Sequence, residues 1–255
     1  MKSILKRTIP LALVAAGLVA SPAMAASIAD HYKDKTITIL IGYGPGGTYD
    51  KYAMTMSRHY GNHIPGKPNV IVQHMPGAGG SKAMNYAYNV MQTEGYNVVM
   101  PLDNIVINQL LRPERMRYEA NKFTWLGSSN QTNNVLVVRT DTGVTDLKSW
   151  RGKSLIASTS GKSSNGYLIP RIVMGTLGLK GKIVTGYKGS RGVDLAMERQ
   201  EIHGRAMVWA STKARRGDWL KAGKLVHLAQ IGPYKLSDMP NVPRLIDMAK
   251  TEKQK

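Results

Sequence analysis

A strand that runs into glycine and restarts on a polar residue is the feature that most limits what this chain can fold into. Residues 37–41 are aliphatic or β-branched, which is typical of a strand buried on both faces. Glycine then fills most positions up to residue 47, where it lets other atoms approach the backbone closely. A helix is expected from Thr48, as its cap, to Gly61, because apolar side chains recur at helical spacing between them. The free N–H groups of its first turn would face the glycine loop, so this strand end is predicted to bind a small anion.

The same arrangement occurs a second time. Residues 70–72 suit a strand, residues 76–80 form a glycine loop, and Ser81 can cap a helix that Gly95 closes. In open α/β sheets, ligands bind at the carboxyl ends of the strands, so two such loops side by side predict a cleft lined by backbone N–H groups. The expected donors are the amides of Gly46, Gly47, Thr48, Gly79 and Gly80.

The second half of the chain alternates strands and helices with a different loop chemistry. Residues 154–157 suit a strand, and residues 158–164 form a hydroxyl-rich loop that leads into a helix. Hydroxyl groups beside a helix start are suited to a carboxylate ligand. Ser190 can cap a further helix. Further strands are expected at residues 206–209 and 226–229, with a boundary between two units near residue 130.

The N-terminus has the pattern of a secretory signal peptide. Basic residues precede an apolar run at residues 9–20, and small residues before position 26 suit cleavage. The run is shorter than the ~20 residues of a membrane span, so we expect residues 1–25 to direct export to the periplasm. The chain has no cysteine, which excludes a lipid-anchored form and any disulfide.

The chain is strongly basic, with 35 Lys and Arg against 16 Asp and Glu, a formal net charge of +19. Such a charge raises encounter rates with anions and would also attract nucleic acid or acidic lipid without specificity. The basic residues are scattered, and the densest stretch, residues 213–224, is interpreted as solvated surface. No zinc-finger spacing or RNA-recognition signature accompanies them, so a nucleic-acid partner is not expected.

The two glycine loops together resemble a known family. Pro45-Gly46-Gly47, with Asp50 three residues on, is followed by Pro76-Gly77-Ala78-Gly79-Gly80. This pairing resembles the substrate-binding proteins of tripartite tricarboxylate transporters, the Bug family. Weaker matches extend the resemblance over nearly all of the chain after residue 35.

The resemblance implies an α/β protein with the two-lobed fold of type II periplasmic binding proteins. It implies a receptor that is not an enzyme, uses no cofactor or metal, captures a di- or tricarboxylate between its lobes and delivers it to a membrane permease. We expect lobe 1 to span residues 26–130, with residues 229–255 returning to it, and lobe 2 to span residues 131–228.

The expected binding residues come from both lobes. Lobe 1 would contribute Tyr43, Gly46, Gly47, Thr48, Asp50, Pro76, Gly77, Ala78, Gly79 and Gly80. Lobe 2 would contribute Ser158, Ser160, Ser163, Ser164, Tyr187 and Lys188. Asp50 has two interpretations: its carboxylate orients the ligand, or it stabilises the first turn of its helix through the macrodipole.

The chain departs from the family pattern at two places. Family members commonly carry an aspartate near a Phe-Asp pair where this chain has Trp209-Ala210-Ser211-Thr212, so the second-lobe contacts stay open. They also complete lobe 1 with a further strand and helix after the helix expected at residues 242–249. We therefore expect that the C-terminal part of lobe 1 is missing and that lobe 1 exposes apolar surface.

Three other binding motifs are incomplete. Residues 42–47 match the glycine spacing of a dinucleotide fingerprint, but no acidic residue occurs at residues 51–93 to hold the ribose. Gly161-Lys162-Ser163 lacks the earlier glycine of a phosphate-binding P-loop. His59 and His63 have metal-ligand spacing but no accompanying glutamate, and are interpreted as an exposed pair.

Two functions of other classes stay open as alternatives. A secreted hydrolase would use the hydroxyl loop or the two histidines, although no Gly-x-Ser-x-Gly motif occurs. A basic surface protein would bind polyanions through its net charge.

Overall fold

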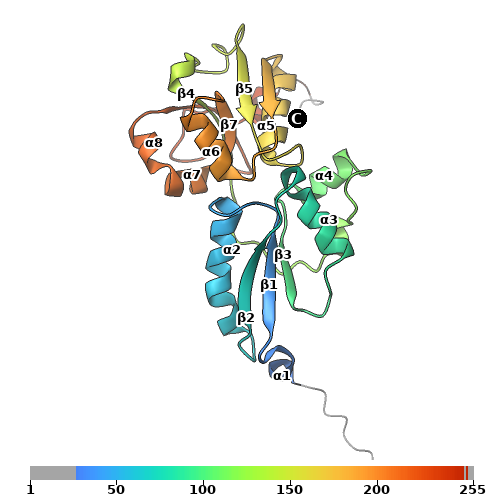
Figure 1. Ribbon diagram of the computed structural model, residues 1–255. Coiled ribbons are helices and arrows are strands. Elements are labelled where there is room, and N and C mark those ends of the chain that lie inside the picture. Colours follow the sequence, from blue (N-terminus) through green and yellow to red (C-terminus); the bar gives the residue numbers. More distant parts are fainter. Residues whose placement is uncertain (1–26, 250, 252–255) are drawn as a thin grey trace, which may run out of the picture.

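The computed structural model describes residues 27–249 and 251, which form two lobes, each built on its own sheet (Figure 1). The expected signal peptide lies outside the described residues. Lobe 1 has a parallel sheet in the order β2-β1-β3, and lobe 2 has a mixed sheet in the order β6-β5-β7-β4-β8. No helix within the described ranges is long and apolar enough to cross a membrane.

Lobe 1 follows the predicted strand, loop and helix alternation. Its strands are β1 (Thr36–Ile41), β2 (Asn69–His74) and β3 (Asn97–Met100), and its helices are α1 (Ile28–Tyr32), α2 (Thr48–His59), α3 (Ser81–Asn89) and α4 (Ile105–Leu111). β1 is the central strand and is buried on both faces, as its composition predicts. Ile39 and Ile41 pack against Ala53 of α2, whereas Leu40 packs on the other face against Met84 of α3.

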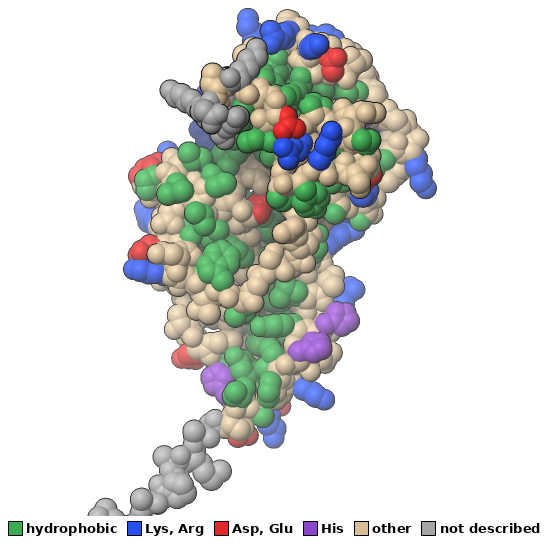
Figure 2. Space-filling model, turned by 180° about the vertical axis from the view of Figure 1, so that it is seen from behind, with side chains coloured by type: hydrophobic (Ala, Val, Ile, Leu, Met, Phe, Trp, Pro, Cys, Tyr) green, Lys and Arg blue, Asp and Glu red, His purple; other side chains and the backbone are tan. Residues whose placement is uncertain are grey.

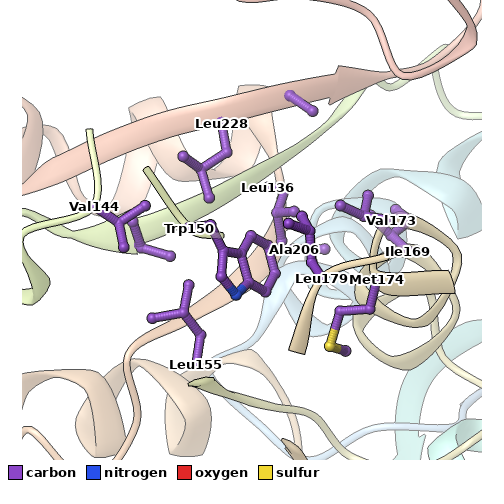
Figure 3. Close-up of a cluster of buried hydrophobic side chains, with 12 residues drawn as sticks. Leu136, Val144, Trp150, Leu155, Ile169, Val173, Met174, Leu179, Ala206 and Leu228 are labelled. Carbon is purple, nitrogen blue, oxygen red and sulfur yellow. The ribbon is translucent and has the colours of Figure 1, made fainter. Parts of the chain in front are cut away.

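Lobe 2 contains β4 (Asn134–Arg139), β5 (Ser154–Ser158), β6 (Lys180–Val184), β7 (Gly204–Val208) and β8 (Leu225–Ile231). Its helices are α5 (Asn165–Leu177), α6 (Ser190–Glu198), α7 (Trp209–Arg215) and α8 (Gly217–Lys221). β5 runs parallel to β6 and β7, and β4 runs antiparallel to β7 and β8. Figure 3 shows one core cluster of this lobe, in which Trp150 lies among Leu136, Leu155 and Leu228. The Trp150 indole N–H donates to the carbonyl of Lys180 at 2.9 Å, so the buried polar group is satisfied.

The segment after β8 differs from the expected return to lobe 1. It folds back along lobe 2, where Gln230 forms a parallel bridge with Arg244. The fully buried Gln230 side chain fixes this path, because its Nε2 donates to the carbonyls of Met239 (3.0 Å) and Val242 (2.6 Å). The helix expected at residues 242–249 is only a short 3-10 turn, Ile246–Met248, because the Leu245 N–H is bonded to Gln230 O.

An exposed apolar surface does occur on lobe 1. Its largest contribution comes from α4, where Val106, Ile107, Leu110 and Leu111 are each at least half exposed.

Candidate functional site

The two lobes enclose a cavity of about 70 Å³. This volume suits a small molecule, since one water molecule needs roughly 10–15 Å³ on the same scale. Lobe 1 lines it with Tyr43, Gly47, Thr48, Tyr49 and Asp103. Lobe 2 lines it with Asn134, Thr159, Ser160, Ser164, Asn165, Gly166, Gly189, Ser190, Val193, Arg205, Ala206 and Val208.

Three helices begin at this cavity. The starts of α2, α5 and α6 lie among its lining residues, and no side chain caps any of the three. Each start therefore offers backbone N–H groups and the positive end of a helix dipole to the enclosed space. Such an arrangement stabilises an anion without any charged side chain.

The predicted side-chain caps are wrong at three helices, and glycine explains why. Thr48 and Ser190 are the first helical residues, while Gly47 and Gly189 occupy the N-cap positions of α2 and α6. The same shift occurs at α3, where glycine rather than Ser81 is the N-cap, with φ of 98°. The positive φ angles at Gly80 and Gly189 favour glycine, and at all three N-caps glycine has no side chain to bond the first N–H groups, which stay available.

Arg205 and Asn134 add side-chain donors from the strands of lobe 2. Asn134 is 8% exposed, lines the cavity, and its side chain has no hydrogen bond within the described part of the chain. Arg205 is also 8% exposed and holds Ser190 O (2.9 Å) and Asp194 (2.5 Å) through Nη1. Its Nη2 has no hydrogen bond to a described residue, and Arg205 lines the cavity, so this group remains available as a donor.

A buried charge cluster supports Arg205. The fully buried carboxylate of Asp194 pairs with Arg205, with Arg215 at 2.9 Å and with Arg216 at 3.3 Å. Burial lowers the pKa of Arg205, and the charge of Asp194 opposes that shift. Glu198 also pairs with Arg216 at 2.8 Å, so three guanidinium groups against two carboxylates leave the cluster behind Arg205 with excess positive charge.

Asp103 adds a carboxyl group, a hydrogen-bond acceptor, to the cavity. The residue as a whole is exposed to solvent, while its two carboxylate oxygens accept hydrogen bonds from Tyr49 (3.2 Å) and from Asn165 of lobe 2 (2.6 Å). Desolvation by the surrounding protein raises the pKa of the Asp103 carboxyl, while the two hydrogen bonds oppose the shift. Burial raises the pKa of Tyr49 well above its usual value, so its hydroxyl stays a donor.

The lobes are closed on each other by contacts around the cavity. Ser163 O accepts hydrogen bonds from Asn104 and Asn108, both at 2.7 Å, and Lys162 O accepts one from Arg112 at 2.7 Å. On the other side of the cavity, the Gly44 N–H donates to Lys188 O at 2.8 Å, and the hydroxyls of Thr48 and Ser211 lie 2.8 Å apart. The structure is therefore the closed form of a two-lobed protein.

The structure separates the predicted binding residues into two groups. The cavity is lined by Tyr43, Gly47, Thr48, Ser160 and Ser164. Outside it lie Gly46, Asp50, Pro76, Gly77, Ala78, Gly79, Gly80, Ser158, Ser163, Tyr187 and Lys188. The second glycine loop lies against the hydroxyl loop of lobe 2 instead, because a Cβ at Gly79 would meet Ser164 N at 2.8 Å.

Asp50 is also turned away from the cavity. Its carboxylate accepts the Gly46 N–H at 2.7 Å and pairs with His74 at 2.6 Å, both within lobe 1. These contacts hold the first glycine loop against the end of β2. Thr159 belongs to the predicted hydroxyl loop, whereas sequence reasoning missed Asp103, Asn134, Asn165 and Arg205 as cavity residues. Arg205 carries the one usable signal, since an arginine inside an apolar strand needs a partner or a ligand.

Neither histidine of the alternative hydrolase or metal interpretation reaches the cavity. His59 ends α2 and His63 belongs to the 3-10 turn that follows. Within residues 27–249 and 251, no group of three or more His, Cys, Asp or Glu could hold a metal ion.

Comparison with known proteins identifies the fold. No family model matches the chain, and no curated protein matches it significantly. Solved structures do match. A periplasmic transporter is 22% identical with a TM-score of 0.71, and the match covers 85% of this chain and 72% of the other. MatC from Rhodopseudomonas palustris with bound malate is 18% identical with a TM-score of 0.70, over 84% of this chain and 72% of the other. The periplasmic binding protein BugD is 15% identical with a TM-score of 0.66, over 85% and 72%.

The chain has the fold of the Bug-type periplasmic binding proteins. This confirms the two-lobed α/β architecture and the resemblance predicted from the glycine loops. In the Bug-type fold of this chain, the first glycine loop borders the cavity and the second borders the contact between lobes.

Proposed function

We propose that this protein is a periplasmic receptor that binds a small organic carboxylate between its lobes and delivers it to a membrane permease of the tripartite tricarboxylate type. The observation that carries the proposal is the convergence of three uncapped helix starts with Arg205 and Asn134 on one closed cavity. Backbone N–H groups, a guanidinium and a carboxamide are all donors, and a carboxylate is an acceptor group that can use them together.

The charge of the chain supports an anionic ligand. The net charge of +19 would steer anions toward the protein, and the Asp194 cluster holds a cation at the cavity wall. On the face shown in Figure 2, Lys and Arg side chains are scattered over both lobes and form no continuous patch.

The structural neighbours support a carboxylate in particular. MatC was solved with malate, a dicarboxylate, and shares this fold. A di- or tricarboxylate is therefore the proposed class, and the periplasm is the proposed location. The proposal includes no enzymatic reaction, for two reasons. BugD, which also shares the fold, is a binding protein. The His59 and His63 pair, on which the alternative hydrolase would depend, lies away from the cavity.

The test is a titration of the purified protein with a panel of small carboxylates, followed by calorimetry of an Asn134→Ala variant. Because the Asn134 side chain has no partner among the described residues, its loss should leave the melting temperature unchanged and weaken binding by about 10- to 100-fold, the range for a hydrogen bond to a charged ligand. Asn133 is the matched control, because its side chain donates to Tyr234 O outside the cavity. Asn133→Ala should lower the melting temperature and leave the affinity unchanged.

A panel in which no carboxylate binds would overturn the proposal. A response to DNA alone would favour the polyanion-binding alternative, and turnover of an ester would favour the hydrolase.

A further inference from the structure

The cavity carries opposite charges at two different depths. Among its lining residues, Arg205 is the basic one and Asp103 is the acidic one. Arg205 is 8% exposed, whereas Asp103 is exposed to solvent, so the cation lies deep in the cavity and the carboxylate lies at its mouth. A ligand whose carboxylate points to Arg205 would therefore turn its other end toward Asp103.

Asp103 is held firmly in that position. The Tyr49 hydroxyl donates to its Oδ1 at 3.2 Å and accepts the Asp103 N–H at 3.0 Å. Asn165, across the cleft, donates to its Oδ2 at 2.6 Å. A carboxylate has about four acceptor positions, so these two side-chain donors leave acceptor capacity for a ligand.

On this basis, we infer that Asp103 selects carboxylates that carry a hydrogen-bond donor, such as a hydroxyl group, at the end facing the cavity mouth. The inference rests on the proposed function and narrows its ligand class to hydroxy acids. A hydroxyl donates to one of the acceptor positions that Tyr49 and Asn165 leave open on Asp103, whereas a methylene at the same place makes no hydrogen bond and takes water away from that position. Discrimination of about 10- to 100-fold is expected, the range for a hydrogen bond to a charged group.

The alternative function of Asp103 is closure alone, because its bond to Asn165 joins the lobes. The two functions predict different effects. Loss of a closure contact weakens every ligand by a similar factor, since all of them need the closed form. Loss of a recognition contact weakens only the ligand that uses it.

The experiment measures affinities for malate and succinate, which differ by one hydroxyl, and for lactate and propionate, which form the matching monocarboxylate pair. The wild-type protein should bind the hydroxylated member about 10- to 100-fold more tightly in at least one pair. Asp103→Ala should bring that ratio close to one. Asn165→Ala keeps the carboxylate but removes the cross-lobe bond, so it should weaken both members similarly and preserve the ratio.

The outcomes separate the two proposals. A wild-type protein that binds both members of each pair equally overturns the inference and leaves the proposed function standing, as does an Asp103→Ala variant that keeps the wild-type ratio. A protein that binds none of the four acids overturns the inference and counts against the proposed function. A wild-type ratio near one overturns the inference even if a variant does not fold.

Discussion

Gly161→Ala should prevent the lobes from closing without disturbing either lobe. A Cβ at Gly161 would overlap the backbone nitrogen of Gly79 and lie 2.6 Å from the carbonyl carbon of Ala78, and both atoms belong to lobe 1. The φ angle of Gly161 lies outside the left-handed region, so alanine causes no backbone strain there. The clash exists only in the closed form.

The magnitude follows from the contacts that the clash would break. Relieving it needs a shift of about 1 Å, which would lengthen the 2.7 Å hydrogen bonds to Ser163 O and Lys162 O to about 3.7 Å, beyond bonding distance. Three such bonds contribute roughly 2–4 kcal/mol to closure. If the ligand binds only the closed form, the affinity should fall by about 30- to 700-fold.

The assay is calorimetry with the tightest carboxylate of the panel, alongside thermal melts without ligand. Gly175→Ala is the matched control, because it lies in the same lobe within α5 and a Cβ there would meet no atom within 4 Å. This control should bind normally and gain about 0.5–1 kcal/mol of stability, as alanine does over glycine in a helix. An affinity of Gly161→Ala within about threefold of the control would refute the closure argument.

Three further predictions concern buried or half-buried polar groups. Asp194→Asn leaves three arginines without their buried counter-ion and should lower the free energy of unfolding by about 3–5 kcal/mol in chemical denaturation. The control Asp247→Asn, in a surface ion pair, should lower it by about 0–1 kcal/mol. Asp50→Asn should lower the free energy of unfolding by about 1 kcal/mol and change the ligand affinity by less than about threefold, because both carboxylate oxygens bond within lobe 1. A large loss of affinity in calorimetry would restore the interpretation that Asp50 orients the ligand. Burial lowers the pKa of His203 below 6.5, and its Nδ1 accepts the Ile156 N–H in the folded protein. As the pH drops below 6.5, the unfolded chain therefore binds a proton at His203 before the folded chain does, and the free energy of unfolding should fall. Thermal melts from about pH 7.5 to about pH 5 should show a weaker decline for His203→Asn than for the wild type.

The first strand, loop and helix could be predicted because their signals are local. Residues 37–41 form a doubly buried strand, and glycine marks the place where the chain must turn into α2. The second glycine loop also lies at a strand end, as its sequence predicts, but its function depends on which residues face it across the cleft. That partner is Gly161, and no local pattern in either segment reveals the contact.

The cavity residues of lobe 2 show the same limit more clearly. Asn134 begins an apolar strand and has no sequence feature that distinguishes it from Asn133, yet only Asn134 lines the cavity. Alternation along the strand turns one side chain toward the cavity and its neighbour away. Which of the two faces the ligand depends on the pairing of β4 with β7 and β8, a contact between segments far apart in the chain.

The positive wall of the cavity depends on the arrangement of the lobes as well as on composition. Arg205 and Arg215 share the carboxylate of Asp194, and Arg215 also donates to the Ser211 hydroxyl at 3.1 Å. Ser211 in turn contacts Thr48 at the start of α2, and this contact crosses from lobe 2 to lobe 1. Hydrogen bonds therefore connect the buried cluster of lobe 2 to the first glycine loop of lobe 1 only when the lobes are closed. A ligand carboxylate at this point would meet the helix start and the guanidinium together. Closure and charge recognition are therefore parts of one network, which is why a clash as remote as the one at Gly161 should reduce affinity.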